Sequence, residues 1–91
     1  MRVTWDPAKA ADNLRDHGVA FADAATVLDD PFAITIDDPD HDEQRFVTLG
    51  ADLTGTILVV VYAYAGEEDI RIISAREASR GEKRRYGNEA R

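Results

Sequence analysis

Residues 56–64 constrain the fold of this chain more than any other segment. They are rich in Val, Ile and Tyr and contain no Gly, Pro or charged residue. Because β-branched and aromatic residues favour strands, this segment is expected to be a strand. An apolar run without alternation is typical of a strand buried on both faces, so residues 56–64 are predicted to lie in the centre of a sheet.

Strand patterns also occur on both sides of this central segment. Turn-forming residues at 52–55 and 65–68 separate it from its neighbours. Consecutive strands with such short connections favour an antiparallel meander. The four predicted strands of this meander cover residues 32–36, 43–50, 56–64 and 70–75.

Helix signals lie before and after the predicted meander. Asp6 can cap a helix that has Pro7 in its first turn, and Gly18 is a typical residue just past a helix end. Ser79 with Glu82 matches a capping box for a last helix that runs to about residue 86. The expected inward residues are Ala8, Ala11 and Leu14 in the first helix and Phe21, Ala24, Ala25 and Leu28 in a second helix over 21–28.

The order of these elements predicts the fold class. A short strand over residues 2–5, two helices, the four-stranded meander and a final helix together predict an α+β fold. At 91 residues, one domain over residues 1–91 is expected, with the helices on one face of the sheet.

Composition excludes several classes of protein. The chain has no Cys, which excludes a disulfide framework, thiolate metal sites and a cysteine nucleophile. No apolar run approaches the ~20 residues that span a membrane. The first residues lack the apolar core of a signal peptide, so a cytoplasmic protein without a membrane partner is expected.

The net charge of −7 argues at first against nucleic-acid binding, because phosphate neutralisation needs Lys and Arg. The charges are unevenly spread, however. Residues 1–44 hold three basic and eleven acidic side chains, a net of −8, whereas residues 45–91 hold eight basic and seven acidic ones, a net of +1. One face of an acidic protein can therefore still bind an anion.

Two strand segments carry candidate chemistry. Glu43 and Arg45 are two residues apart on a predicted strand, so both side chains project from one face, about 7 Å apart. They could act as a base and a phosphate clamp, or form a surface ion pair. Arg71 lies in an apolar strand on the face opposite Ser74, and Arg76 stands where that strand ends. Both arginines could bind an anion or pair with an acidic residue.

Other polar residues have a functional and a structural interpretation. His17 could be a general acid or base, or it could interact with the dipole at a helix C-terminus. His41 lies in an acidic loop that is expected to be solvated. The run that includes Arg80 and ends at Tyr86 could be an RNA- or partner-binding edge, or simply a basic helix end. No metal-binding, phosphate-loop or dinucleotide motif is present.

The ordered set of these residues resembles the BrnT family of toxins. The matching residues are Trp5-Asp6-Pro7-x-Lys9, Asn13, His17-Gly18-Val19-x-Phe21, Asp30-Pro31, Glu43-x-Arg45, and Ile70-Arg71-Ile72-Ile73-Ser74-Ala75-Arg76 with Ala78, Glu82 and Tyr86. The resemblance implies a RelE-like fold and an RNA-cleaving toxin of a type II toxin–antitoxin system that arrests growth. It also implies a hetero-oligomer with a ribbon-helix-helix antitoxin of the BrnA type. This toxin–antitoxin complex is expected to bind operator DNA through the antitoxin.

The resemblance also suggests roles for individual residues. Arg45, Arg71 and Arg76 are expected to stabilise the phosphate and Glu43 to act as the base. The general acid stays open between His17, Lys9 and Tyr86. Lys9, Arg80 and Tyr86 are expected to contact the RNA, whose own 2′-OH is the nucleophile, with no metal or cofactor.

The chain departs from the family pattern at the turn after residue 64. Family members often carry an Arg there, whereas this sequence reads Ala65-Gly66-Glu67-Glu68. Ala20 in place of a Ser or Thr cap and Gly81 in the last helix are two further departures. A second hypothesis is therefore a non-enzymatic module that binds the antitoxin and regulates the operon, with weakened or lost nuclease activity.

Overall fold

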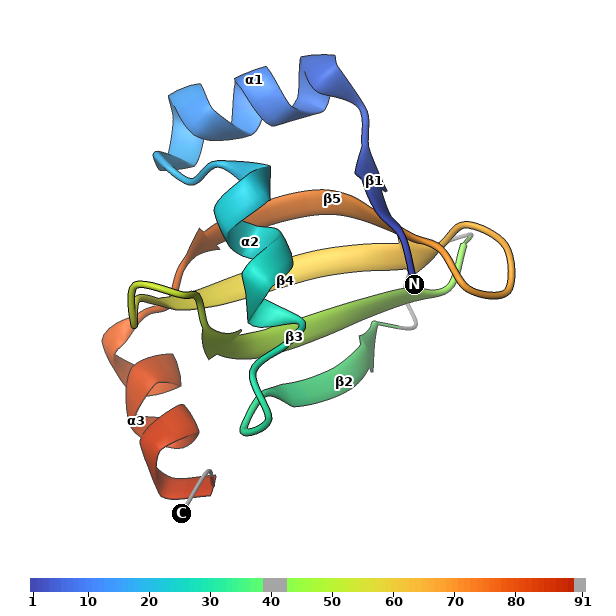
Figure 1. Ribbon diagram of the computed structural model, residues 1–91. Helices are drawn as coiled ribbons and strands as arrows, with labels where there is room; N and C mark the ends of the chain where they lie inside the picture. Colours follow the sequence, from blue (N-terminus) through green and yellow to red (C-terminus); the bar gives the residue numbers. More distant parts are fainter. Residues whose placement is uncertain (39–42, 90–91) are drawn as a thin grey trace.

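The computed structural model describes residues 1–38 and 43–89. It confirms the predicted α+β class and the order of the elements (Figure 1). These are β1 (Val3–Trp5), α1 (Pro7–His17), α2 (Phe21–Val27), β2 (Ile34–Asp38), β3 (Arg45–Ala51), β4 (Ile57–Tyr64), β5 (Ile70–Glu77) and α3 (Arg80–Glu89). Among the described residues, no helix is long and apolar enough to cross a membrane.

The strands form one five-stranded sheet in the order β1-β5-β4-β3-β2. Strands β2 to β5 pair antiparallel with their chain neighbours, which confirms the predicted meander. As predicted, β4 lies in the middle of the sheet and is largely buried on both faces. The N-terminal strand β1 adds a parallel edge, because Val3–Trp5 pairs with Ile70–Ile72.

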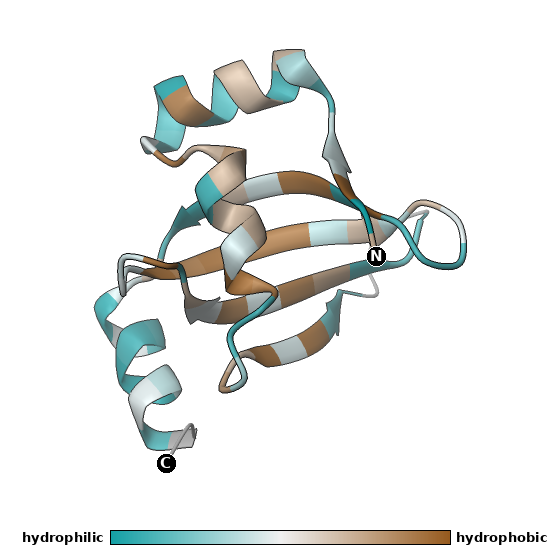
Figure 2. Ribbon diagram, viewed as in Figure 1, coloured by the Kyte–Doolittle hydropathy of each residue, from teal (hydrophilic) through white to brown (hydrophobic). Residues whose placement is uncertain are grey.

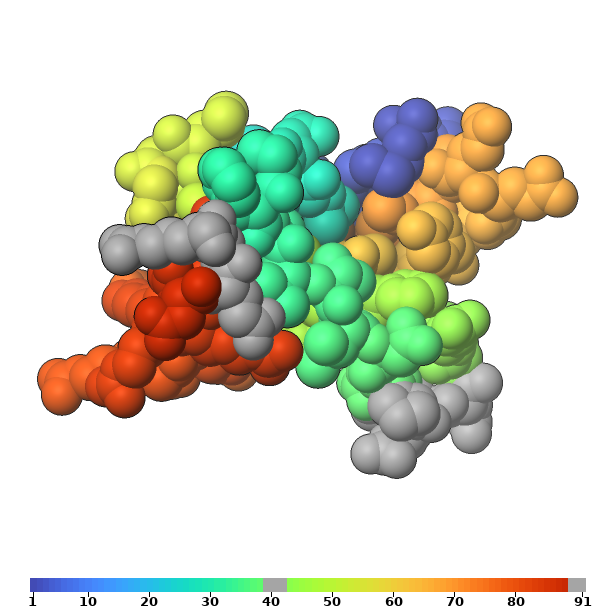
Figure 3. All heavy atoms as spheres, turned by 90° about the horizontal axis from the view of Figure 1, so that it is seen from below, coloured from blue at the N-terminus to red at the C-terminus, as the bar shows by residue number. Residues whose placement is uncertain are grey.

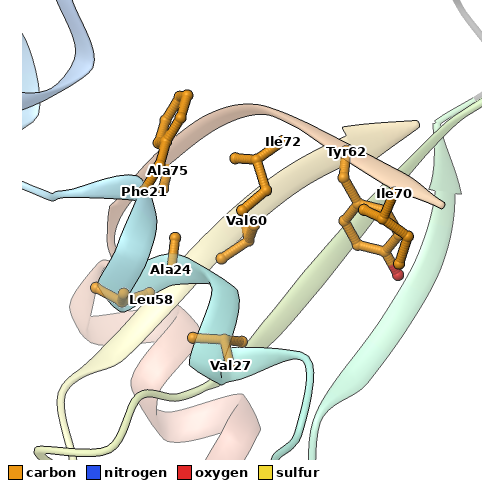
Figure 4. Packing of buried hydrophobic residues seen from close by; sticks show 9 residues of the cluster. All are labelled: Phe21, Ala24, Val27, Leu58, Val60, Tyr62, Ile70, Ile72 and Ala75. Carbon is orange, nitrogen blue, oxygen red and sulfur yellow. The ribbon is translucent and has the colours of Figure 1, made fainter. Parts of the chain in front are cut away.

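The main core lies between the sheet and α2 (Figure 4), and Ala10 of α1 packs at its margin. Phe21, Ala24 and Val27 of α2 pack onto inward residues of β4 and β5. Trp5 meets Phe21 edge to face, with ring centroids 6.0 Å apart. Apolar residues are concentrated in the strands, whereas α3 is mostly hydrophilic (Figure 2).

Helix α1 does not bury the face that its apolar spacing predicts. Ala8, Ala11 and Leu14 are exposed, and Asn13 is the buried residue of this helix. The reason is the end of β1 at Trp5, which leaves the outer edge of β5 without a strand partner from there on. The Asn13 side-chain amide donates to the Ala75 carbonyl at 2.8 Å, and its oxygen accepts from the Ala75 N–H at 3.0 Å. This hydrogen-bonding demand outweighs the burial of a leucine.

Helix α3 lies on the opposite face of the sheet from α1 and α2, so the prediction that all helices cover one face was wrong. Tyr86 of α3 and Ala78 just before it pack against Leu49 and Val59, which form a second, smaller core. A polar helix with a few apolar contacts can cover only part of a sheet face. Much of this face is therefore open beyond α3.

Strand β2 begins two residues later than predicted. Phe32 is 57 % exposed and lies in a turn, where its N–H donates to the Asp30 side chain at 2.9 Å. This side-chain-to-backbone hydrogen bond competes with the strand ladder and delays the strand until Ile34. The strand β5 is also longer than expected and ends at Glu77.

Candidate functional site

Arg45, Ala63 and Arg71 lie in one row across the strands β3, β4 and β5. In the strand register Ala63 is paired with Arg45 on one side and with Arg71 on the other. Paired residues of neighbouring strands point to the same face, and two strand spacings separate the arginine Cα atoms by about 9.5 Å. We call this face of the sheet, opposite to α1 and α2, the arginine face.

A β-bulge in β5 determines which other side chains join the arginine face. Tyr62 pairs with Ile72 and Val61 with Ser74, so Ile73 is an extra residue in the ladder. The extra residue reverses the alternation of the side chains beyond it. Ser74 therefore lies on the same face as Arg71, which corrects the prediction that the two lie on opposite faces. Arg76, which pairs with Val59, also points to the arginine face.

Glu43 completes a cluster of charges with Arg45 and Arg71. One terminal nitrogen of Arg71, Nη2, donates to both carboxylate oxygens of Glu43 at 2.8 Å. The Nε of Arg45 lies 3.7 Å from Oε1 of Glu43, within ion-pair range but too far for a hydrogen bond. This Nε is buried and has no hydrogen-bond partner among the described residues. The structure thus brings together the predicted base and two of the three predicted phosphate ligands.

Arg76 lies apart from this cluster and holds α3. Arg71 pairs with Ala63 and Arg76 with Val59, and these partners are four residues apart on β4, which corresponds to about 13 Å along the strand. The Arg76 guanidinium binds both carboxylate oxygens of Glu82 at 2.7 and 2.9 Å. The predicted capping box is confirmed, because Glu82 accepts from the Ser79 N–H and the Ser79 hydroxyl accepts from the Glu82 N–H. The Arg76 hydrogen bonds and the Ser79 N–H together lower the pKa of Glu82 to about 2.

The Tyr86 hydroxyl forms a hydrogen bond that joins α3 to the segment before β2. The hydroxyl donates to Oδ2 of Asp30 at 2.6 Å, and Figure 3 shows α3 beside this segment. The hydrogen bond to the Asp30 carboxylate, with partial burial, raises the pKa of Tyr86 to about 12. Burial opposes the Asp30 charge, but hydrogen bonds from Ala51, Tyr86 and Phe32 outweigh it and lower the pKa of Asp30. The hydroxyl of Tyr86 is therefore a structural donor.

The remaining predicted site residues lie away from the Glu43 cluster. Lys9 and His17 are on α1 and line a shallow surface hollow together with Ile73. Arg80 is an exposed residue at the start of α3. His41 lies outside the described residues.

An aliphatic groove runs along the arginine face between the sheet and α3. Its floor consists of branched side chains, and Ile36 is 48 % exposed. The lining residues are Ile34, Ile36, Val47, Leu49, Val59, Glu82 and Arg85. None of them is aromatic, so this groove offers no ring on which a nucleic-acid base could stack.

Two residues that position the site were not identified from chemistry in the sequence. Asn13 anchors α1 to β5, and Ala63 provides the small side chain between the two arginines. Hydropathy gives no signal for the first, because the apolar spacing of α1 points to Ala8, Ala11 and Leu14 instead. In the described part of the chain, no three His, Asp or Glu side chains gather in a way that could hold a metal ion.

Comparison with known proteins matches this geometry to one family. Residues 5–82 match the family model described as the ribonuclease toxin BrnT of the type II toxin–antitoxin system. The crystal structure of the Brucella abortus ribonuclease toxin BrnT superimposes with a TM-score of 0.67 at 28 % identity, covering 88 % of this chain and 99 % of that one. No curated protein sequence matches the chain. Because the family model spans most of its length, the chain belongs to the BrnT family of ribonuclease toxins of type II toxin–antitoxin systems.

Proposed function

We propose that this protein is an RNA endonuclease toxin that cleaves RNA through the substrate's own 2′-OH, without a metal ion. The observation that carries this proposal is the cluster of Glu43 with Arg45 and Arg71 on the open arginine face. A carboxylate that can accept a proton lies beside two guanidinium groups that can hold a phosphate. These are the groups that phosphoryl transfer from an internal nucleophile needs.

In the proposed reaction, Glu43 accepts the proton of the 2′-OH, and the 2′-oxygen attacks the neighbouring phosphorus. Arg45 and Arg71 stabilise the negative charge that develops on the phosphoryl oxygens. The bond to the 5′-oxygen breaks, which leaves a 2′,3′-cyclic phosphate and a 5′-hydroxyl. Since Lys9 and His17 lie on α1 and Tyr86 is bound to Asp30, we assign the proton for the 5′-oxygen to solvent water.

Arg76 and Arg80 have a different part in this proposal. Arg76 fixes the start of α3 through Glu82, which leaves Arg80 exposed on a basic helix. Exposed cations there attract the RNA backbone without reading its sequence.

We further propose that a ribbon-helix-helix antitoxin neutralises the toxin by covering the arginine face, and that the complex reaches operator DNA through the antitoxin. The support for this partner surface is the aliphatic groove, whose exposed Ile36 suits the apolar side chains of a protein segment. The adjacent arginines suit an acidic residue at the end of that segment.

Expression of the chain without an antitoxin tests the proposal, with cell growth and RNA integrity as readouts. We expect the wild type to arrest growth and degrade RNA, and Glu43→Gln and Arg71→Ala to do neither. The purified wild type should cleave RNA in EDTA and leave 2′,3′-cyclic phosphate ends. Arg2→Ala is a matched control, because it removes another exposed ion pair, with Asp69, and should leave cleavage unchanged.

The same experiment tests the non-enzymatic alternative. The specific observation in its favour is the acidic turn with Glu67 and Glu68, directly before β5, where an additional phosphate-binding Arg is absent. If wild-type chain at high expression leaves growth and cellular RNA intact while it still binds an antitoxin, the alternative replaces the nuclease proposal.

A further inference from the structure

We propose that Arg45 and Arg71 form an anion site whose occupant at rest is the protein's own Glu43, and that the RNA phosphate displaces this carboxylate. The inference rests on the proposed function and adds an ordered event to it. Binding of the substrate would itself release the base that the reaction needs. At rest, an internal carboxylate then competes with solvent anions for the site.

The geometry places Glu43 where a phosphate would bind. Its two oxygens are equidistant, at 2.8 Å, from one Arg71 nitrogen, and Oε1 is 3.7 Å from Arg45 Nε. A phosphate presents the same fork of two oxygens to guanidinium groups as a carboxylate does. The carboxylate therefore mimics the anion for which the two arginines are arranged.

Arg45 shows that Glu43 fills this site incompletely. Its Nε is buried and lacks a hydrogen-bond acceptor within the described residues. A buried unpaired donor is unfavourable, and the donor of a guanidinium especially so. A phosphate has more acceptor oxygens than a carboxylate, so it can satisfy Arg71 and this Nε at the same time.

The two sides of the contact differ in how firmly they are held. Arg45 and Arg71 are in strands β3 and β5, on either side of the central strand β4. Glu43 precedes β3, lies in a bend, and its side chain is 46 % exposed. The carboxylate is thus the movable member, and a half-exposed ion pair contributes little against its displacement.

Displacement prepares the reaction. When the phosphate takes over the Arg71 hydrogen bonds, both Glu43 oxygens become available beside the bound nucleotide. One of them then accepts the 2′-OH proton as the O2′–P bond forms and the P–O5′ bond breaks. Water gives its proton to the 5′-oxygen, and the hydroxide that remains takes up the proton from Glu43, so the base and the water are both restored and no further reactant is needed.

Titration with inorganic phosphate, followed through the NMR signals of the arginine Nε–H groups, tests the inference. We expect Glu43→Gln to bind phosphate about fivefold more tightly than the wild type, the factor that corresponds to a surface ion pair of about 1 kcal/mol. Glu68→Gln is the matched control. It removes the same charge from an exposed turn residue and should change the affinity by less than twofold.

A double variant tests whether the higher phosphate affinity of Glu43→Gln arises at the proposed site. In Glu43→Gln with Arg71→Ala, the increase in phosphate affinity should disappear, and the Arg45 Nε–H signal should no longer shift. Thermal unfolding of each variant checks that the fold is intact, which is expected because Glu43 and Glu68 are exposed and the Arg71 side chain is partly exposed.

Two results would overturn the inference. The first is that Glu43→Gln binds phosphate no more tightly than Glu68→Gln. The second is that the double variant, which lacks Arg71, keeps the higher phosphate affinity of Glu43→Gln. These results are independent of the nuclease assay. If the wild type cleaves no RNA but Glu43→Gln gains phosphate affinity, the proposed function fails and the anion site stands. If the wild type cleaves RNA and Glu43→Gln shows no gain, only the displacement fails.

Discussion

Arg45 and Arg71 flank Ala63 in one row of the sheet, and Ala63 is only 2 % exposed. The two arginines come from strands that are not neighbours. Their separation is therefore set by β4 and by the size of the side chain between them. A small residue here adds no bulk between the two guanidinium groups that Glu43 bridges.

Ala63→Leu should therefore reduce RNA cleavage without removing any charged group. The larger side chain fills the space between the guanidiniums, and a displacement of about 1 Å in a site can cost as much as a hundredfold in rate. We expect at least a tenfold loss in a cleavage assay. Ala65→Leu, at an exposed turn position, is the control, and equal rates for the two variants would refute this role of Ala63.

Asn13→Ala should destabilise the fold far more than Leu14→Ala. The Asn13 amide makes three hydrogen bonds, two with Ala75 and one with the Val19 carbonyl, and its loss leaves buried backbone groups unpaired. We expect a loss of about 3 kcal/mol for Asn13→Ala. Leu14 is 53 % exposed, so Leu14→Ala should cost well under 1 kcal/mol. Urea denaturation measures both, and a larger effect at Leu14 would contradict the observed orientation of α1.

The contribution of Glu82 to stability should depend on pH. Its pKa in the folded protein is about 2, against 4.5 for an unperturbed carboxyl, because Arg76 and the Ser79 N–H bind the charged form. A lowered pKa stabilises the fold above the unfolded value and loses this effect as the pH falls from about 4.5 to about 2. Thermal unfolding of the wild type and Glu82→Gln should therefore differ at pH 7 and converge toward pH 2. A difference that stays constant with pH would contradict the assignment.

Ile36→Asp should separate antitoxin binding from catalysis. A charge on the floor of the aliphatic groove would oppose burial by a partner, and we expect at least a tenfold weaker complex with the antitoxin. RNA cleavage should change less than antitoxin binding, because Ile36 pairs with Val47, two residues along β3 from Arg45, and lines the groove rather than the Glu43 cluster. Leu53→Asp, at an exposed turn residue, is the control for added charge. Isothermal titration calorimetry measures the affinity, and an unchanged value would place the partner elsewhere.

The sequence was sufficient for the local relationships of the site. Spacing identified the Ser79–Glu82 capping box, and it placed Glu43 near Arg45. The predicted strand over 43–50 was wrong at its start, because β3 begins at Arg45 and Glu43 lies in a bend before it. That Arg71 joins Glu43 follows from the pairing of β3, β4 and β5, which brings residues 28 positions apart into contact. No local pattern encodes that register.

Two errors have a common physical origin in backbone hydrogen bonding. The two-residue alternation of a regular strand predicted Ser74 on the sheet face opposite to Arg71, because it does not include the extra residue at Ile73. Helical spacing of the apolar residues predicted Leu14 on the buried face. Hydropathy carries no information about the N–H and C=O of Ala75, which lack a strand partner and bind Asn13 instead. Each error lies at the irregular half of β5, where the ladder departs from its regular form.

The Asn13 contact also protects the protein against self-association. An unpaired strand edge invites pairing with the edge of another molecule. By taking up both edge groups of Ala75, Asn13 occupies part of the β5 edge that β1 is too short to cover, and α1 packs beside it. Intermolecular strand addition is thereby directed away from this edge, and β2 at the other end of the sheet is left as the side on which another chain can add a strand.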